Sequence, residues 1–251
     1  MQSNYKKIVI IGATSAIAEH CARLWVKDVK ISLVLVGRDL KKISPMAADL
    51  RIRSPESTII TQEANFIDPT LITELVDAIV ADGPVDLVLI AHGTLPAQTT
   101  CQTDLTITNH TLNINGISPV LFAEAFAGHM QQVNHGTIAI ISSVAGERGR
   151  KSNYVYGAAK GLVSRYAEGL QHRLAKTGVN VVLIKPGPTA TPMTAHLPQK
   201  PGSKARVEDV AHRIVSKINQ RQSVIYAPAK WTFIMLIIRN LPKFIFNKMD
   251  I

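Results

Sequence analysis

The sequence predicts an α/β protein with a doubly wound parallel sheet of seven strands and helices on both faces. Short apolar runs alternate with longer helix-like segments along the 251 residues, and this alternation is typical of strands joined by crossover helices. The first run, Ile8 to Ile11, is apolar throughout, as in strands covered on both faces. No repeat or linker interrupts the sequence. We therefore expect one domain over residues 1–228, with residues 229–251 as an apolar and basic tail of the same domain.

Each predicted strand is a short apolar run, and turn-forming residues help to delimit them. Ser54-Pro55 precedes the third strand and Gly83-Pro84 the fourth. In chain order, the expected strands are Ile8 to Ile11, Ile31 to Val36, Thr58 to Gln62, Asp86 to Ala91, Thr137 to Ser142, Val179 to Ile184 and Val224 to Tyr226.

The segments between several of these strands are predicted to be helical. One helix follows the first strand, and another begins at Pro69, a residue that suits the first turn of a helix, and runs to about Ala81. The segment Thr111 to Val133 contains Pro119, which cannot donate a backbone hydrogen bond and predicts a kink. The other helices are expected over Tyr156 to Lys176, ended by Gly178, and over Val207 to Asn219.

The chain is strongly basic, with a net charge of +10 from 28 Lys and Arg against 18 Asp and Glu. Such an excess indicates an anionic partner, such as cofactor phosphates, a phosphorylated substrate or a membrane surface. Nucleic acid is not expected, since aromatic residues are few and no binding motif is present. We expect a homo-oligomer.

Two cysteines, Cys21 and Cys101, offer neither a disulfide framework nor metal-ligand spacing, so we expect no metal and a reducing, cytoplasmic compartment. Lys6-Lys7 and the apolar run after them imitate a secretory signal. Cleavage there would delete the first strand, so we expect none.

The turn after the first strand uses small residues where a backbone must approach a pyrophosphate. It reads Gly12-Ala13-Thr14-Ser15-Ala16-Ile17-Ala18 and leads into a helix whose first amides would point at the anion. The alternative is an ordinary buried strand-turn-helix.

A tyrosine and a lysine four residues apart carry the chemistry. Tyr156 and Lys160 share one helix face, with Ser143 thirteen residues upstream of the tyrosine. A free phenol titrates near ~10, and we expect the Lys160 ammonium to lower the pKa of Tyr156. A serine hydroxyl can hold a substrate carbonyl against the phenol. This set is suited to proton transfer at an oxygen whose carbon exchanges hydride, which requires a bound carrier.

These motifs resemble the short-chain dehydrogenase/reductase family from end to end. The family's TGxxxGxG pattern corresponds to IGATSAIA in this sequence, and its NNAG motif corresponds to Ile90-Ala91-His92-Gly93. Its active-site asparagine matches Asn115, and its catalytic serine, tyrosine and lysine match Ser143, Tyr156 and Lys160. Its PG motif matches Pro186-Gly187, which is followed by Thr191. Ala16 and Ala18 replace two glycines of the first motif. The resemblance implies a Rossmann-like fold, a nicotinamide cofactor, and a catalytic Asn115 that fixes a water behind Lys160. The alternative for Asn115 is a helix-kink residue near Pro119.

NADP(H) is favoured over NAD(H), which stays possible. Arg38, after the second strand, suits the 2′-phosphate of NADP(H). Asp39 beside it is evidence for NAD(H), because an acidic residue at this point would bind the ribose hydroxyls. The expected cofactor-binding residues are Gly12, Thr14, Ser15, Ala16, Ile17, Arg38, Asn65, Phe66, Ala91, Gly93, Tyr156, Lys160, Pro186, Gly187, Thr189 and Thr191.

Two segments are expected to meet the substrate. The loop Glu147 to Lys151 places cations near the active-site mouth, where Arg148 and Arg150 could hold a phosphate; a solvated loop is the alternative. The segment Thr189 to Ala205 is long enough for a lid and contributes Met193.

The tail carries an apolar block, Trp231 and Phe233 to Ile238, followed by Arg239, Lys243 and Lys248. The block is too short to span a bilayer but suits a helix lying in the membrane interface. An oligomer contact or packing on the core is the alternative. The tail and the active-site half further resemble family members that reduce decaprenylphosphoryl-2-keto-pentose in the synthesis of cell-envelope polysaccharide precursors.

Three function classes follow from these observations. The first is a reductase of a keto group on a polyprenyl-phosphate sugar, acting at the inner face of the membrane. The second is a reductase of another hydrophobic carbonyl, such as a keto-lipid or steroid. The third is a non-catalytic nucleotide sensor, which the complete set of Ser143, Tyr156 and Lys160 disfavours.

Overall fold

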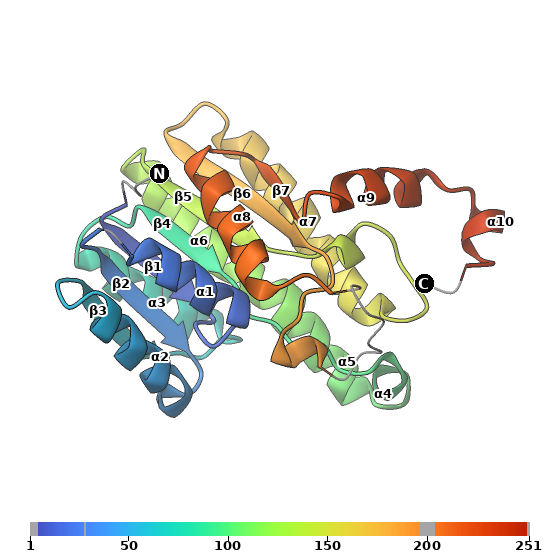
Figure 1. Ribbon diagram of the computed structural model, residues 1–251, viewed down its shortest axis with the longest axis horizontal. Helices are drawn as coiled ribbons and strands as arrows, with labels where there is room; N and C mark the ends of the chain where they lie inside the picture. Colours follow the sequence, from blue (N-terminus) through green and yellow to red (C-terminus); the bar gives the residue numbers. More distant parts are fainter. Residues whose placement is uncertain (1–4, 28, 196–203, 250–251) are drawn as a thin grey trace.

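The computed structural model describes residues 5–27, 29–195 and 204–249. Its centre is a sheet of seven parallel strands in the order β3-β2-β1-β4-β5-β6-β7 (Figure 1). The strands are β1 (Lys7–Ile11), β2 (Ser32–Gly37), β3 (Thr58–Glu63), β4 (Leu87–Ile90), β5 (Gly136–Ile141), β6 (Val179–Pro186) and β7 (Val224–Ala227). The predicted α/β class is confirmed, and each expected strand is present to within two residues at either end.

Helices cover both faces of the sheet, because successive strand residues point to opposite sides. The helices are α1 (Ala16–Trp25), α2 (Leu40–Arg53), α3 (Pro69–Ala81), α4 (Gln98–Thr103), α5 (Leu105–Leu112), α6 (Ser118–Gln132), α7 (Tyr154–Leu174), α8 (Val207–Asn219), α9 (Trp231–Asn240) and α10 (Lys243–Phe246). Ile8 and Ile10 join a core beneath α1, α2 and α8, whereas Val9 and Ile11 join a second core beneath α3, α6 and α7. Both cores end at the carboxyl edge of the strands, where α/β sheets hold their ligands.

The predicted helix over Thr111 to Val133 is divided by a π-helical turn, Asn113–Ile117. Pro119 lies in the first turn of α6, and it cannot donate to the carbonyl four residues back, which belongs to Asn115. The Ser118 amide donates instead to the Asn113 carbonyl, five residues back. The regular α-helix is therefore interrupted just before Pro119, and the interruption takes the form of a wide turn that carries Asn115.

The tail forms two short helices that project beyond the sheet (Figure 1). Helix α9 spans Trp231–Asn240 and α10 spans Lys243–Phe246. Within the described residues, no helix is both long enough and apolar enough to cross a membrane. At the other end of the chain, β1 pairs with both β2 and β4, so the first strand lies inside the sheet.

Candidate active site

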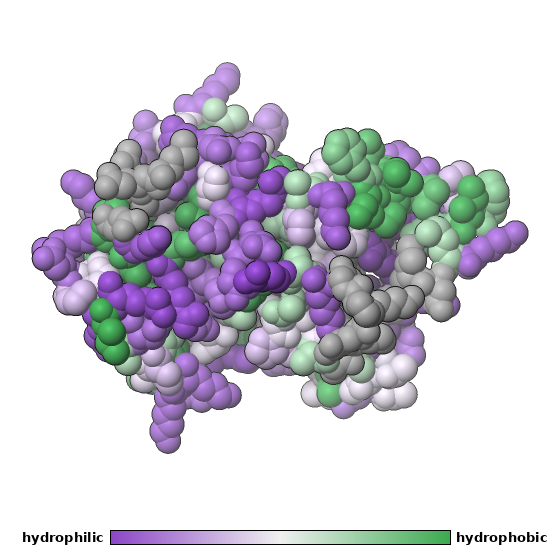
Figure 2. Space-filling model, viewed as in Figure 1, coloured by the Kyte–Doolittle hydropathy of each residue, from purple (hydrophilic) through white to green (hydrophobic). Residues whose placement is uncertain are grey.

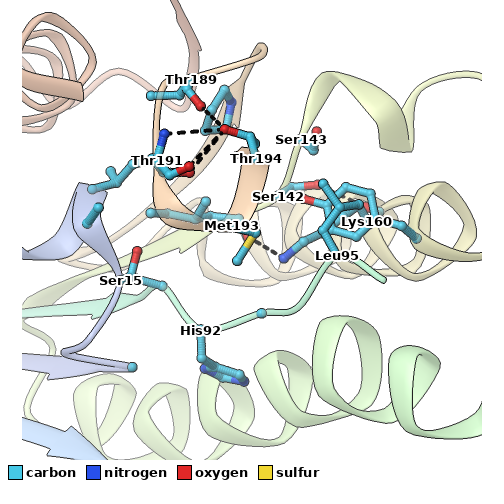
Figure 3. A pocket seen from close by; sticks show the side chains of 18 of the residues that line it. Ser15, His92, Leu95, Ser142, Ser143, Lys160, Thr189, Thr191, Met193 and Thr194 are labelled. Atoms are coloured by element: carbon cyan, nitrogen blue, oxygen red, sulfur yellow. Dashed lines mark hydrogen bonds between the residues drawn. The ribbon is translucent and has the colours of Figure 1, made fainter. Parts of the chain in front are cut away.

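A cavity at the carboxyl ends of the strands gathers most of the predicted site residues. Lys160 and Ser143 lie on one side, Ser15 and His92 lie on the other, and Met193 stands between them (Figure 3). The predicted residues that line it are Gly12, Thr14, Ser15, Ala16, Ile17, Arg38, Phe66, Ala91, Gly93, Ser143, Arg150, Tyr156, Lys160, Pro186, Gly187, Thr189, Thr191 and Met193. Asn65, Asn115 and Arg148 are not among its lining residues.

The three catalytic candidates come from β5 and α7. Helix α7 places Tyr156 and Lys160 one turn apart, with the Lys160 ammonium 5.9 Å from the centre of the Tyr156 ring. The Lys160 Nζ donates to the Ile141 carbonyl at 3.0 Å, which fixes the side chain. Ser143 lies just past the end of β5, and its hydroxyl is near enough to the Tyr156 phenol to act on its pKa. A carbonyl oxygen placed against both hydroxyls would therefore meet a positioned proton donor.

Ser142, the neighbouring hydroxyl, has a structural role. Its Oγ donates to the Lys160 carbonyl at 2.8 Å and lies 2.8 Å from the Ser164 Oγ. These bonds tie β5 to the middle of α7, so the Ser142 hydroxyl is already engaged and Ser143 is the serine left to meet a substrate carbonyl.

Burial, and not the nearby ammonium, dominates the titration of the pair. Burial raises the pKa of Tyr156 to about 12, and the Ser143 hydroxyl acts in the opposite direction. Burial also lowers the pKa of Lys160 to about 8. The expectation that Lys160 lowers the phenol pKa is therefore corrected, because both groups are desolvated and burial disfavours the charged form of each. A phenol that keeps its proton at neutral pH suits proton donation.

These values predict how carbonyl reduction depends on pH. Lys160 loses its charge as the pH rises through about 8, whereas Tyr156 stays protonated until about 12. If the ammonium assists the transfer, kcat/KM for reduction should fall above about pH 8, with no contribution from the phenol. Initial rates at constant ionic strength, with circular dichroism at each pH as a control for unfolding, measure this profile. A profile that stays flat up to the phenol pKa would contradict the assignment.

Asn115 lies behind the cavity and is fully buried. Its Nδ2 donates to the Thr111 carbonyl at 2.9 Å, and its Oδ1 accepts from the Thr94 amide at 2.9 Å. Both polar atoms of the side chain are thus used to hold the strand-end segment against the π turn. The side chain is a structural tie beside Lys160, and a role in holding water stays a prediction.

The turn after β1 has the shape that a diphosphate requires. Gly12 has φ +87, and a Cβ there would come within 2.6 Å of His92. Ser15 is the N-cap of α1, yet its hydroxyl makes no capping bond. The first amides of α1, including those of Ala16 and Ile17, therefore face the cavity without a side-chain cap.

Arg38 and Asp39 have separate roles. Asp39 caps α2 by accepting from the Lys41 amide at 2.9 Å. Arg38 is exposed, lines the cavity, and has no hydrogen bond or ion pair to any other residue that the structure describes. Arg38 and Asp39 form no ion pair with each other, and Asp39 is engaged with the backbone at the start of α2.

Phe66 reaches the cavity, whereas the neighbouring Asn65 is held in a turn outside it. Phe66 is buried and lines the cavity. The Asn65 Oδ1 accepts from the amides of Ile67 and Asp68, at 2.8 and 3.1 Å, in a turn that precedes α3. An asparagine that closes its own turn is not free to meet an adenine through that oxygen.

His92 lines the cavity although it was not predicted as a site residue. It packs edge-on against Phe66 and Phe122, with ring centroids 4.7 and 5.8 Å away, and its Nε2 lies 2.9 Å from the Ser118 Oγ. Burial lowers the pKa of His92 to about 3, so the ring is neutral. The one feature of the sequence that could have indicated a cavity position for His92 is its place in Ile90-Ala91-His92-Gly93, which matches the family's NNAG motif.

Arg148 does not reach the cavity, contrary to the expectation that it binds substrate. It donates to the carbonyls of Ile238 and Leu241, the latter at 2.7 Å, and stacks on the Phe246 ring at 3.8 Å. The last carbonyls of a helix lack partners within it. Arg148 satisfies those at the end of α9 and ties the tail to the loop after β5.

The expected lid lies partly outside the described residues, which omit 196–203. Its two described ends meet where Thr189 pairs with Ala205. Thr194 Oγ1 donates to the Thr189 carbonyl at 2.6 Å, which gives the turn that carries Met193 a fixed shape.

Comparisons with known proteins agree with this geometry. The family model for short chain dehydrogenases matches residues 6–202. An uncharacterized oxidoreductase from Mycobacterium tuberculosis is 29% identical over 96% of each chain. Another, from Streptomyces coelicolor, is 26% identical over 97% of this chain and 96% of its own.

Solved structures show the same fold. A short chain dehydrogenase/reductase from Burkholderia phymatum in complex with NAD superposes with a TM-score of 0.84, at 20% identity, over 100% of this chain and 99% of that one. A short-chain dehydrogenase from Sphingobium yanoikuyae in complex with NADPH gives a TM-score of 0.80, at 22% identity, over 91% of each chain. The chain belongs to the short chain dehydrogenase family of oxidoreductases.

Proposed function

We propose that this protein is an NADPH-dependent reductase of a keto group on a lipid-linked, polyprenyl-phosphate sugar. The observation that carries the proposal is one cavity that joins Ser143, Tyr156 and Lys160 to an uncapped helix N-terminus and a basic residue after β2. The proton would come from Tyr156.

The residues present fit a dinucleotide. The turn at Gly12 and the first amides of α1 would hold the pyrophosphate, Arg38 the 2′-phosphate, and Lys160 the nicotinamide ribose. When bound, NADPH would supply the hydride. The similar fold of the Sphingobium enzyme, solved with NADPH, supports this choice, whereas the Burkholderia enzyme was solved with NAD.

Each catalytic residue then has a defined task. Ser143 orients the substrate carbonyl by hydrogen bonding to its oxygen. Tyr156, protonated because burial raises its pKa to about 12, donates a proton to that oxygen. The Lys160 ammonium, held by the Ile141 carbonyl, stabilises the phenolate that remains.

Replacing Arg38 by Ala should weaken NADPH binding about 10- to 100-fold and change NADH binding little, because charge-assisted hydrogen bonds contribute about 1.5–3 kcal/mol. Fluorescence titration with both cofactors measures the effect. Lys41→Ala, an exposed cation three residues away, is the matched control. Equal losses for NADPH and NADH would show that Arg38 does not meet the 2′-phosphate.

The lipid-linked substrate is proposed from the shape of α9. Its inner face packs on the site, since a Cβ at Gly187 would lie 1.8 Å from the Trp231 Nε1 and Met235 is fully buried. Its outer face is also apolar, and hydrophobic side chains gather over α9 and α10 (Figure 2). The large apolar side chains exposed there are Phe233, Leu236, Ile237, Phe244, Ile245 and Met249. A helix that is apolar all round is normally buried all round.

A membrane surface is the proposed cover for this outer face. Lys230, Lys243 and Lys248 accompany the apolar residues, and each cation adds about 1 kcal/mol of attraction to an anionic surface. The enzyme would lie in the cytoplasm at the inner face of the membrane, and it would bind the polyprenyl-phosphate sugar at the membrane that holds the polyprenyl chain. The resemblance to reductases of decaprenylphosphoryl-2-keto-pentose supports a role in cell-envelope polysaccharide synthesis.

Two charged substitutions on the outer face should release the enzyme from membranes. Phe233→Glu with Ile237→Glu places two carboxylates on side chains that are 72% and 64% exposed, so the fold should survive. We expect loss of co-sedimentation with anionic liposomes and of long-chain substrate turnover, while a short soluble analogue is still reduced. Deleting the tail is a poorer test, because it would also remove Trp231 and so abolish its contact with Gly187 beside the cavity.

The control is a pair of carboxylates elsewhere on the exposed surface, Ile52→Glu with Leu105→Glu, where both side chains are 80% exposed. If the unsubstituted protein stays in the supernatant with anionic liposomes at low salt, the membrane proposal is wrong. The tail would then cover another subunit.

A second candidate is a reductase of another hydrophobic carbonyl, such as a keto-lipid or steroid. Leu95 and Met193 line the cavity, and both would suit an apolar ketone. The two candidates differ in whether turnover depends on a phosphate in the substrate.

A further inference from the structure

Arg150 is a cavity-lining cation that has no hydrogen-bonded anion among the described residues. Its Nε is buried without a partner, and its Nη2 reaches only the Met235 sulfur, at 3.5 Å. Burial lowers the pKa of Arg150, but a guanidinium keeps its charge in proteins. Arg150 as a whole is half-buried, and a guanidinium N–H buried without an acceptor is costly.

The nearest carboxylate is engaged elsewhere. The Glu147 Oε1 accepts from Lys185 at 2.7 Å and from the Tyr226 hydroxyl, and its Oε2 lies 3.8 Å from Arg239. Glu147 therefore acts on Arg150 only at a distance. The described lining of the cavity includes Arg38, Arg150 and Lys160 and no carboxylate.

Asn153 presents a second polar atom without a partner. It occupies the N-cap of α7, where an asparagine normally accepts from an amide of the first turn, yet it makes no such bond. Gln98, from α4, accepts from the Val155 amide instead, at 3.1 Å. The Asn153 Oδ1 is left buried and unpaired in a residue that lines the cavity.

These two residues come from a different part of the sheet than the residue proposed to bind the 2′-phosphate. Arg38 follows β2 and Arg150 follows β5, and β1 and β4 lie between these strands. Three strand spacings amount to about 14 Å. Arg150 and Asn153 instead precede Tyr156 by six and three residues, on the loop that leads into α7.

We propose that Arg150 and Asn153 form a substrate subsite in which Arg150 binds a phosphoryl oxygen and Asn153 accepts from a neighbouring hydroxyl. The inference rests on the proposed function, and it deepens that function by assigning recognition of a phosphorylated, hydroxyl-bearing ketone to two residues. An anionic acceptor for Arg150 and a donor for Asn153 are both present in a sugar phosphate. An apolar ketone offers neither, because its one acceptor, the carbonyl oxygen, is placed by the proposed mechanism against Ser143 and Tyr156.

The test is a binding measurement that needs no turnover. Geranyl phosphate and geraniol, which differ only in the phosphate, are titrated calorimetrically into the enzyme with NADPH present. The wild-type protein should prefer the phosphate, and Arg150→Met should reduce the ratio of the two Kd values about 10- to 100-fold, the usual effect of losing a charge-assisted hydrogen bond. Lys151→Met, the adjacent exposed cation, should keep the preference.

Asn153→Asp provides an independent variant that keeps the side-chain shape. A carboxylate there would add a negative charge to the proposed subsite and repel the phosphate, so the preference should also be lost. Inorganic phosphate, titrated alone, should bind more weakly than geranyl phosphate; equal affinity would mark a free-phosphate site and overturn the substrate assignment.

A wild-type protein without phosphate preference, or an Arg150→Met protein that keeps it, would overturn the subsite. Ketone turnover that depends on NADPH and Tyr156 would survive that result. Conversely, if the wild-type enzyme reduces no ketone with NADPH, the proposed function is refuted, whereas the measured preference for geranyl phosphate is unaffected.

Discussion

Tyr156→Phe is expected to lower the rate of ketone reduction by about 10²- to 10⁴-fold, the usual contribution of a positioned general acid. The substitution removes one oxygen from a half-buried side chain that lines the cavity, so the fold should be kept. NADPH binding should change little, because Lys160 is fixed independently by the Ile141 carbonyl. Steady-state kinetics and a fluorescence titration of the cofactor measure the two effects separately.

The matched control is Tyr154→Phe. Tyr154 is the first residue of α7 and is 44% exposed. It lies six residues from Lys160, on a different face of the helix. Its loss should leave reduction near the wild-type rate. Comparable losses for both variants, or normal turnover by Tyr156→Phe, would remove Tyr156 from the proton-donor role.

The second large effect is on stability, at the buried pair of Glu147 and Lys185. Their side chains are 3% and 6% exposed, and the Lys185 Nζ lies 2.7 Å from the Glu147 Oε1. Lys185→Met would leave the carboxylate buried with only the Tyr226 hydroxyl and the more distant Arg239. Breaking one side of a buried pair costs about 3–5 kcal/mol. Urea denaturation should show a loss of this size.

Glu147→Gln in the Lys185→Met background is the control, because it removes the stranded charge. This double variant should recover part of the lost free energy of unfolding. Lys217→Met, in the last turn of α8, should change it little, because that Nζ donates only to the exposed Gln220 side chain. If Lys185→Met alone is as stable as the wild type, the Glu147–Lys185 ion pair does not stabilise the contact between β6 and the loop that follows β5.

The sheet was predictable because its strands are buried on both faces. Every position of β1 is buried, and all of them except Lys7 are apolar, so its pattern in the sequence is unambiguous. Tyr156 and Lys160 were predictable because a spacing of four fixes their common face on a helix. Helix α2 was less readable, since Pro45 lies inside it and its charged residues obscure the apolar stripe.

Contacts between distant segments were not predictable. Arg148 and Arg150 are equivalent in the sequence, yet Arg148 meets the end of α9, about ninety positions later, whereas Arg150 faces the cavity. Asn153 is an ordinary N-cap residue by sequence, and only the bond between Gln98 and Val155 shows that its oxygen is not needed there. The pKa of Tyr156 depends on burial, which spacing does not reveal.

The proposal that the cavity reduces a ketone with NADPH is tested most directly by isotope transfer. The enzyme is supplied with NADPH deuterated at the transferring position of the nicotinamide and with a short-chain lipid-phosphate keto-sugar. We predict an alcohol product that carries deuterium at the former carbonyl carbon, formed by the wild-type protein and not by Tyr156→Phe. An unreduced ketone, or an alcohol without deuterium at that carbon, would contradict the account.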